Sequence, residues 1–259
     1  MARKSDFVFQ LVALIVAVIG VHLTYEMVIR PRAAAHLEKV EADPEAAQKR
    51  SMSVIMKDYE QESCIILAFW AMAILASKAR MVSADRRSLS TEVLQLPEGR
   101  RVLPEDARDL SRSIEGLPVE TREALLPRAL VVALHRFDSS RNIQDVAEAA
   151  NSVCQAEAER LESELSIIRY IAWAIPSLGF IGTVRGISEA LGKAHSALTG
   201  DITGVTQSLG VAFNSTLVAL LISIVLMFLI HQLQLFQERY VLDTQAACEE
   251  RLIRHLHTR

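Results

Sequence analysis

The chain has 259 residues, of which 51% are hydrophobic and 23% charged, with a formal net charge of -3. A chain this rich in apolar residues is not disordered, and its near-neutral charge, without one-sided clusters of Lys and Arg, gives no reason to expect a nucleic-acid partner. Cys64, Cys154 and Cys248 are widely separated, and the histidines are scattered. We therefore expect no disulfide framework and no metal site. Common nucleotide-binding and hydrolase motifs do not occur, so we expect neither an enzyme nor a cofactor.

The apolar residues are concentrated in four segments separated by charged stretches. A bilayer core is spanned by about 20 apolar helical residues, and segments of this kind cover residues 7–29, 64–81, 170–191 and 205–231. The fold class that we predict is an all-α integral membrane protein with four transmembrane helices. The basic start of the first segment also resembles a signal peptide. However, the small residues from Ala33 to Ala35 lie far beyond its most apolar part, so we expect an uncleaved anchor.

The polar stretch between the second and third segments sets the predicted orientation. A basic cluster follows the second segment and consists of Lys78, Arg80, Arg86 and Arg87. Arg169 precedes the third segment. Because Lys and Arg accumulate on the cytoplasmic side of membrane proteins, we place residues 83–166 in the cytoplasm, together with both termini of a multi-pass protein of the bacterial inner membrane. Arg30 and Arg32, on the predicted outer side, argue against this orientation.

Helix breakers are missing over long parts of the second half of the chain. No proline or glycine occurs between Asn142 and Pro176, and the fourth segment continues past His231 without a breaker. This pattern predicts that the last two transmembrane helices extend into a cytoplasmic helical bundle. We therefore divide the chain into a transmembrane hairpin with an outer loop (1–82), a cytoplasmic helical region (83–166), a second transmembrane pair (167–232) and a cytoplasmic C-terminal helix (233–259).

Small residues form a stripe along the third segment. On a helical wheel Pro176, Gly179 and Thr183 lie within one sector, because offsets of four and seven return to nearly the same face. Gly182 and Gly186 widen this stripe. Small residues let membrane helices approach closely, so we expect the stripe to pack against another helix, with Thr183 near the middle of the bilayer.

The fourth segment repeats the pattern. Thr216 shares a face with Ala219 and Ser223. Ser215 borders that face, whereas Asn214 points almost the opposite way. A hydroxyl at middle depth on each of two successive spans predicts a polar seam inside an assembly. An alternative stays open, in which Thr and Ser side chains bond to the carbonyl four residues earlier and only pack the helices.

Arg185 and Glu189 are the charged residues within the third segment, and they lie on the side roughly opposite Thr183. Opposite charges four positions apart on a helix predict an ion pair, within the helix or at an interface, in the outer half of the bilayer. A role for these two residues in gating is the alternative.

Two stretches carry a resemblance to a known family. Residues 176–187 read PSLGFIGTVRGI and residues 212–223 read AFNSTLVALLIS. The first resembles the proline-leucine-glycine-leucine-leucine-glycine-threonine-valine signature of the channel subunits TolQ and ExbB in the MotA/TolQ/ExbB proton channel family, and the second is similar to the following span of that family. The four-span layout is closer to that of MotA. The resemblance implies that Thr183 and Thr216 line a pore, which makes residues 167–232 a channel-forming helix pair.

We place the neighbouring polar residues in the same predicted ion pathway, which therefore contains Thr183, Thr216, Ser215, Ser223 and Asn214. The resemblance further implies a pentameric ring around a single-span partner like MotB, TolR or ExbD, whose membrane Asp takes the proton in an ion-driven motor complex. One departure concerns Val211, because TolQ and ExbB carry a glutamate about five residues before the second threonine. A non-conducting membrane scaffold with the same ring is therefore the alternative. The residues do not distinguish proton from sodium, and they do not name the process that the complex drives.

Overall fold

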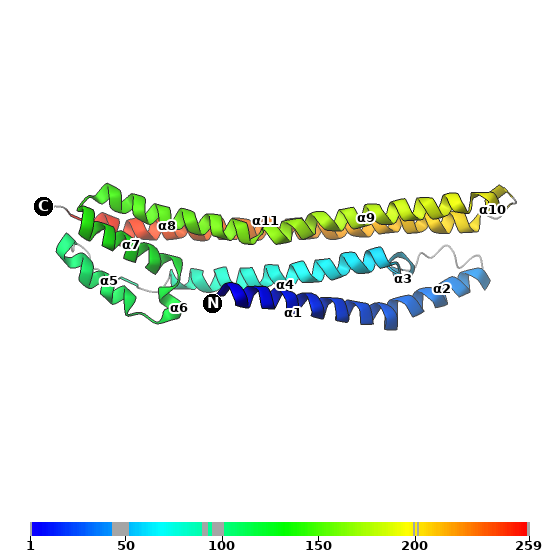
Figure 1. Cartoon of the computed structure of the whole chain (residues 1–259), viewed down its shortest axis with the longest axis horizontal. Helices are drawn as coiled ribbons and strands as arrows, with labels where there is room; N and C mark the ends of the chain where they lie inside the picture. Colours follow the sequence, from blue (N-terminus) through cyan, green and yellow to red (C-terminus); the bar gives the residue numbers. More distant parts are fainter. Residues whose placement is uncertain are drawn as a thin grey trace. The chain divides into compact units, whose positions relative to one another are not determined.

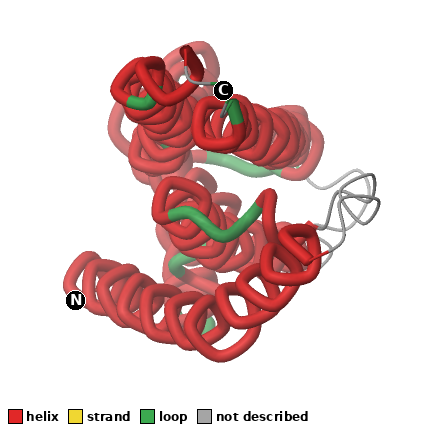
Figure 2. The backbone as a smooth tube through the Cα atoms, turned by 90° about the vertical axis from the view of Figure 1, so that its right-hand side faces the viewer, coloured by secondary structure: helices red, strands yellow, loops and turns green. Residues whose placement is uncertain are grey.

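The computed structural model describes residues 2–42, 52–89, 93–94, 101–198, 200 and 202–257. Parts of the predicted outer loop (43–51) and of the predicted cytoplasmic region (90–92 and 95–100) lie outside the described residues. The described backbone is almost entirely helical and contains no strand, apart from one isolated bridge between Val102 and Leu256 (Figures 1 and 2). The predicted all-α fold class is confirmed.

Eleven α-helices and three short helical turns follow one another in the described part of the chain. The α-helices are α1 (Ala2–Thr24), α2 (Arg30–Ala42), α3 (Met52–Ile55), α4 (Tyr59–Ser88), α5 (Ala107–Glu115), α6 (Val119–Arg122), α7 (Leu125–Ser140), α8 (Ile143–Glu164), α9 (Ser166–Gly192), α10 (Ala194–Leu198) and α11 (Thr203–Arg251). The turns are η1 (Tyr25–Ile29), η3 (Pro104–Asp106) and η4 (Ile253–His255). Only Leu165 separates α8 from α9 in the chain, as the missing helix breakers predict.

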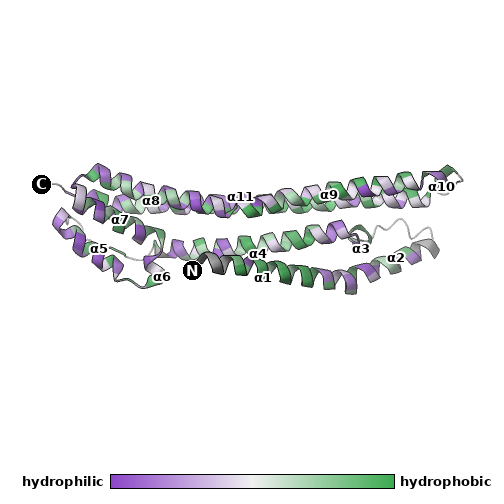
Figure 3. Ribbon diagram, viewed as in Figure 1, coloured by the Kyte–Doolittle hydropathy of each residue, from purple (hydrophilic) through white to green (hydrophobic). Residues whose placement is uncertain are grey.

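The chain forms two compact units. The first contains Met1–Ala76 and Ile167–Ile230, and the second contains Ser77–Ser166 and His231–Arg259. Four helical segments among the described residues are long and apolar enough to cross a membrane: Phe7–Lys39, Tyr59–Arg87, Ile143–Gly192 and Thr203–His255. Hydrophobic residues cover most of α1, whereas α5 and α8 carry many hydrophilic ones (Figure 3). The four predicted spans therefore correspond to four apolar helices.

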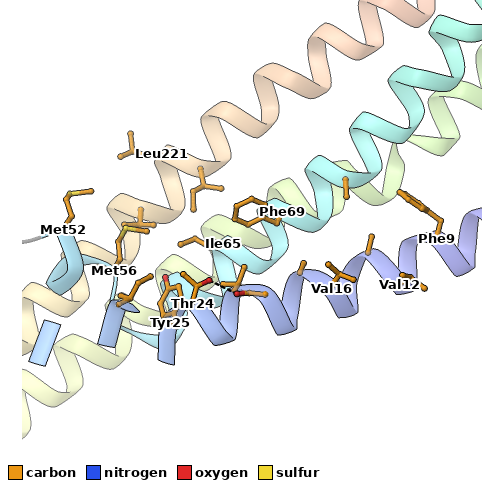
Figure 4. A pocket seen from close by; sticks show the side chains of 18 residues that line it. Phe9, Val12, Val16, Thr24, Tyr25, Met52, Met56, Ile65, Phe69 and Leu221 are labelled. Carbon is orange, nitrogen blue, oxygen red and sulfur yellow. Dashed lines mark hydrogen bonds between the residues drawn. The ribbon is translucent and has the colours of Figure 1, made fainter. Parts of the chain in front are cut away.

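The N-terminal helix α1 packs only lightly within the first unit. The Trp70 indole donates a 2.9 Å hydrogen bond to the Gln10 carbonyl, and Glu62 bonds with His22 at 2.7 Å and with Arg30 at 2.6 Å. Between these contacts an apolar cavity of about 1030 Å³ opens, lined by residues of α1, η1, α3, α4 and α11 (Figure 4). The polar contacts described here for α1 are both made with α4.

The second unit is a helical bundle around its own hydrophobic core. Leu126, Leu130 and Phe137 of α7 are fully buried there, together with Cys154 of α8 and Cys248 of α11. At one junction Asn142 caps α8, because its side-chain oxygen accepts a 3.0 Å hydrogen bond from the Gln144 amide. Lys78 of α4 bonds with Glu164 of α8 at 2.9 Å. The second unit therefore has a hydrophobic core of its own, to which α7 and parts of α4, α8 and α11 contribute.

Candidate ion-pathway site

The hydroxyls of Thr183 on α9 and Thr216 on α11 are hydrogen bonded to each other. Thr183 Oγ1 also lies 3.2 Å from the carbonyl oxygens of Gly179 and Ala212, and Thr216 Oγ1 lies 3.1 Å from the Gly179 carbonyl oxygen. Both side chains are half-buried. The two predicted hydroxyls therefore meet. Thr183 also lies within bonding distance of the carbonyl four residues earlier, as the packing alternative describes, whereas the backbone acceptor of Thr216 is on α9.

Glycines bring the two helices close enough for this contact. A Cβ atom on Gly186 would lie 2.7 Å from the backbone nitrogen of Ala212 and from the Ser208 carbonyl oxygen. A Cβ on Gly179 would lie 2.6 Å from the Ala219 Cβ. Because real Cβ atoms do not approach other atoms this closely, only glycine fits at these positions. The predicted stripe of small residues on α9 thus faces α11.

Pro176 and Ser223 form a second contact between α9 and α11. Pro176 lies inside α9 and has no backbone N–H, so the carbonyl of Ala172, four residues earlier, loses its partner within the helix. The buried Ser223 hydroxyl donates a 3.0 Å hydrogen bond to this Ala172 oxygen. Ser223 therefore satisfies a carbonyl that an apolar environment would otherwise leave unpaired.

Ser215 connects α11 to α4. Its side chain is 1% exposed, and its hydroxyl donates to the Val211 carbonyl at 2.8 Å. The amide nitrogen of Gln61, at the start of α4, lies 3.4 Å from the Ser215 hydroxyl oxygen and donates to the Ile55 carbonyl at 3.0 Å. Asn214 is half-buried and takes no part in this hydrogen-bond network among the described residues.

Gln61 is a residue that the sequence analysis missed. It is 0% exposed, which is unusual for an amide side chain. Its position before the apolar part of α4 placed it outside the predicted second span, which begins at residue 64. The helix itself begins at Tyr59. The signal that could have found Gln61 is the helix-compatible sequence that continues back from residue 64 to Tyr59 without a breaker.

Arg185 has two carboxylate partners. It bonds with Glu189 at 3.0 Å, at the predicted spacing of four residues, and it also donates two hydrogen bonds of 2.7 Å to Glu60 of α4. The Glu60 side chain is 11% exposed and the Arg185 side chain 40%. The bidentate geometry makes the contact with Glu60 the stronger of the two. The sequence analysis predicted only Glu189.

Asp58 lies directly before α4, next to this group of charges. Burial is the main cause that raises the pKa of its carboxyl above the ordinary 3.8. Lys57 and Arg185 act in the opposite direction, while Glu60 and Glu189 add to the effect of burial. Among the described residues, no three His, Cys, Asp or Glu side chains are grouped so as to hold a metal ion. The carboxyl groups of this region can exchange protons, and its hydroxyl and amide groups can donate and accept hydrogen bonds.

Comparisons with known proteins bear on the same region of the chain. Residues 121–246 match the sequence model of the MotA/TolQ/ExbB proton channel family. The biopolymer transport protein exbB1 of Vibrio cholerae serotype O1 (strain ATCC 39315 / El Tor Inaba N16961) is 28% identical over 168 residues, which cover 61% of this chain and 71% of that relative. No solved structure matches the chain. The matched part of the chain contains all of the contacts between α9 and α11 described above. It belongs to the MotA/TolQ/ExbB proton channel family, a family of channel-type membrane proteins rather than of enzymes.

Proposed function

We propose that this chain is the channel-forming subunit of a proton-driven inner-membrane motor complex, in which copies of the chain form a pentameric ring around a single-span partner. The observation that carries the proposal is the hydrogen-bonded pair of Thr183 and Thr216 on the two helices that the family match covers. In this proposal the pair lies at the wall of an enclosed, hydrated pathway.

The proposal includes a partner chain because threonine hydroxyls cannot themselves carry the proton. A threonine hydroxyl can orient water and accept or donate hydrogen bonds, but its pKa is far too high for it to hold or release a proton at neutral pH. Position 211 of α11 is a valine, which offers no acid. A membrane carboxylate on a partner like MotB, TolR or ExbD would take up the proton, and Thr183 and Thr216 would bond to that carboxylate or to its water.

We further propose an orientation for the complex. The basic residues after the second span and Arg169 before the third support a cytoplasmic location of the second unit. Both termini are then also cytoplasmic, and the Glu60 to Arg185 contact lies toward the outer face. Proton passage from the outer to the inner side would drive movement of the ring relative to its partner.

A non-conducting scaffold is the second candidate function. Two observations favour it: Val211 supplies no acid, and the threonine pair already has backbone partners, which helix packing alone would explain. A scaffold of this kind would keep the ring and the partner but would not pass ions.

The two candidates differ in the response to removal of one hydroxyl. The complex would be purified with its single-span partner and reconstituted in vesicles, and proton influx would be followed with an internal pH dye after a pH step. For a channel, we expect Thr183→Val and Thr216→Val to abolish influx, and Thr183→Ser to retain it. A scaffold predicts no difference between any of these variants and the unmodified complex.

The matched control is Thr206→Val. Thr206 is an exposed threonine near the start of α11 whose hydroxyl bonds to the Ile202 and Thr203 carbonyls. It undergoes the same chemical change outside the proposed pathway. Native mass measurement of each complex shows whether the ring has assembled, so that loss of influx is separated from loss of assembly.

A further inference from the structure

A carboxyl group and a buried amide lie where α4 approaches the polar seam. We propose that Asp58 takes up protons at the outer end of the ion pathway and that Gln61 is the hydrogen-bond partner of its protonated form. The inference rests on the proposed channel function and assigns to the chain itself an acid that α11 lacks at Val211.

Asp58 and Gln61 are three residues apart at the start of α4. The Asp58 carbonyl accepts a 3.2 Å hydrogen bond from the Glu62 amide, which places Asp58 at the N-cap of the helix. Residues three positions apart are neighbours on a helix surface. This spacing allows the Asp58 and Gln61 side chains to approach each other at the start of α4.

Both side chains carry an oxygen that lacks a partner. Asp58 Oδ2 and Gln61 Oε1 are buried and have no hydrogen-bond partner among the described residues. The orientation of the Gln61 amide is fixed, because only its nitrogen can donate to the Ile55 carbonyl. An ionised carboxylate and an amide oxygen are both acceptors and cannot bond to each other. A protonated Asp58 can donate to Gln61 Oε1, which would satisfy both oxygens at once.

Gln61 also contacts α11, the helix that carries Thr216. Its nitrogen lies 3.4 Å from the hydroxyl oxygen of Ser215, the residue before Thr216. A Cβ on Gly182 would lie 2.6 Å from the same Ser215 oxygen, so α4, α9 and α11 meet at this point. A polar contact thus connects Gln61 to Ser215, which directly precedes Thr216 in α11.

The charges around Asp58 leave its carboxyl able to change protonation. Arg185, the nearby cation on α9, already donates to Glu60 and Glu189, so its charge is largely neutralised. Lys57 is the other cation that acts on Asp58. Burial, Glu60 and Glu189 raise the pKa of Asp58. A carboxyl with a raised pKa exchanges its proton more readily near neutral pH than an ordinary one.

The proposed step is a simple proton relay. A proton from the outer aqueous phase adds to Asp58 Oδ2, and the resulting O–H donates to Gln61 Oε1. The proton then passes to the partner's membrane carboxylate through water, which the relay requires between the two groups, and the Asp58 carboxylate is restored. One proton enters and one leaves, and no other reactant is consumed.

A purely structural role for Asp58 as a helix cap is the competing explanation, and it allows a sharp test. Asn and Ser cap helices about as well as Asp, but they cannot carry a proton. In the reconstituted complex with its partner, we expect Asp58→Asn and Asp58→Ser to lower proton influx at least about tenfold, while Asp58→Glu retains influx with a changed pH profile. Unchanged influx in both capping variants overturns the proposal.

Gln61 supplies the second arm of the test. Gln61→Leu removes the acceptor oxygen and should lower influx, whereas Gln61→Glu keeps an oxygen at that place and should retain part of it. If the capping variants fail to assemble, the pH profile of the Asp58→Glu complex decides, and a profile identical to that of the unmodified complex overturns the proposal. If proton influx is lost in Thr183→Val but normal in Asp58→Asn, the result contradicts the role of Asp58 and leaves the proposed channel function intact. If the unmodified complex passes no protons, the result contradicts both proposals.

Discussion

The Arg185 guanidinium donates two hydrogen bonds of 2.7 Å to the Glu60 carboxylate. This contact ties the start of α4 to the third apolar helix, α9, at the level of Gly182, whose added Cβ would lie 3.2 Å from the Glu60 side chain. The ion pair and the Gln61 to Ser215 contact together hold three apolar helices around one polar region. The α4 helix is therefore joined to α9 and α11 by hydrogen bonds as well as by apolar packing.

Removal of Arg185 should destabilise the first unit. Arg185→Ala leaves Glu60, which is 11% exposed, as an unpaired charge, and we expect a loss of about 2 kcal/mol or more. The free energy of unfolding would be measured by titration with a denaturing detergent in mixed micelles. Glu189→Gln is the control, because Glu189 is 42% exposed and its pair should contribute less than about 1 kcal/mol. Equal losses in the two variants would contradict the ranking of the two contacts.

Helical periodicity placed Thr183 and Thr216 on faces of small residues, but it predicted neither their bond to each other nor their ion-paired surroundings. Thr183 and Thr216 each lie on a stripe of small residues, and such a stripe indicates the face along which two membrane helices meet. Glu60 and Gln61 could not be predicted in this way, because a helical wheel of α9 does not say which side chain of another helix faces it. A search for apolar residues also begins the second span at residue 64 and assigns these two residues to a loop.

The hydrogen-bond partner of Ser223 is another feature that the sequence did not predict. The place of this serine on the Thr216 face put it in the predicted ion pathway, whereas its hydroxyl bonds to the Ala172 carbonyl. Pro176, four residues after Ala172, is the feature that identifies this carbonyl as unpaired within α9. Ser223 reaches the Ala172 carbonyl because of the register between α9 and α11. The sequence of neither helix specifies this register alone.

Glycine positions on α9 and α11 should respond oppositely to the same substitution. At Gly186 an added Cβ meets backbone atoms of α11 at 2.7 Å, so Gly186→Ala must push the helices apart and should cost about 1–3 kcal/mol. At Gly210 nothing lies within 4 Å of the added Cβ, so Gly210→Ala should be neutral or stabilise by about 0.5–1 kcal/mol. Both free energies come from the same detergent titration. A Gly186→Ala protein as stable as the unmodified one would show that α9 and α11 do not pack as described.

Ser223→Ala should reduce stability and leave proton influx unchanged. The loss of the hydroxyl leaves the buried Ala172 carbonyl unpaired, which we expect to cost about 1–3 kcal/mol. A double-mutant cycle with Pro176→Ala tests the cause. An alanine at position 176 restores the N–H that can bond to the Ala172 carbonyl, so the cost of Ser223→Ala should become smaller in that background. An unchanged cost in the cycle, or lost influx in a well-assembled Ser223→Ala complex, would assign Ser223 to the ion pathway instead.

Asp58 should make the stability of the protein depend on pH. Its pKa is raised above 3.8 in the folded state, so the folded state binds the proton more tightly than the unfolded state does. The number of bound protons is then larger in the folded state between the ordinary and the raised pKa, and the free energy of unfolding falls as pH rises through this window. Below the ordinary pKa both states are protonated, and the full stabilising contribution is present.

Asp58→Asn isolates this contribution from that of other titrating groups, because asparagine caps the helix but stays neutral at every pH. We expect the stability of the variant relative to the unmodified protein to increase as pH rises above about 4 and then to level off. Detergent titrations of both proteins at a series of pH values measure the difference. The same variant should have lower proton influx, so its gain in relative stability at neutral pH would accompany a loss of output. A stability difference independent of pH would show that the Asp58 carboxyl titrates as an ordinary solvent-exposed acid.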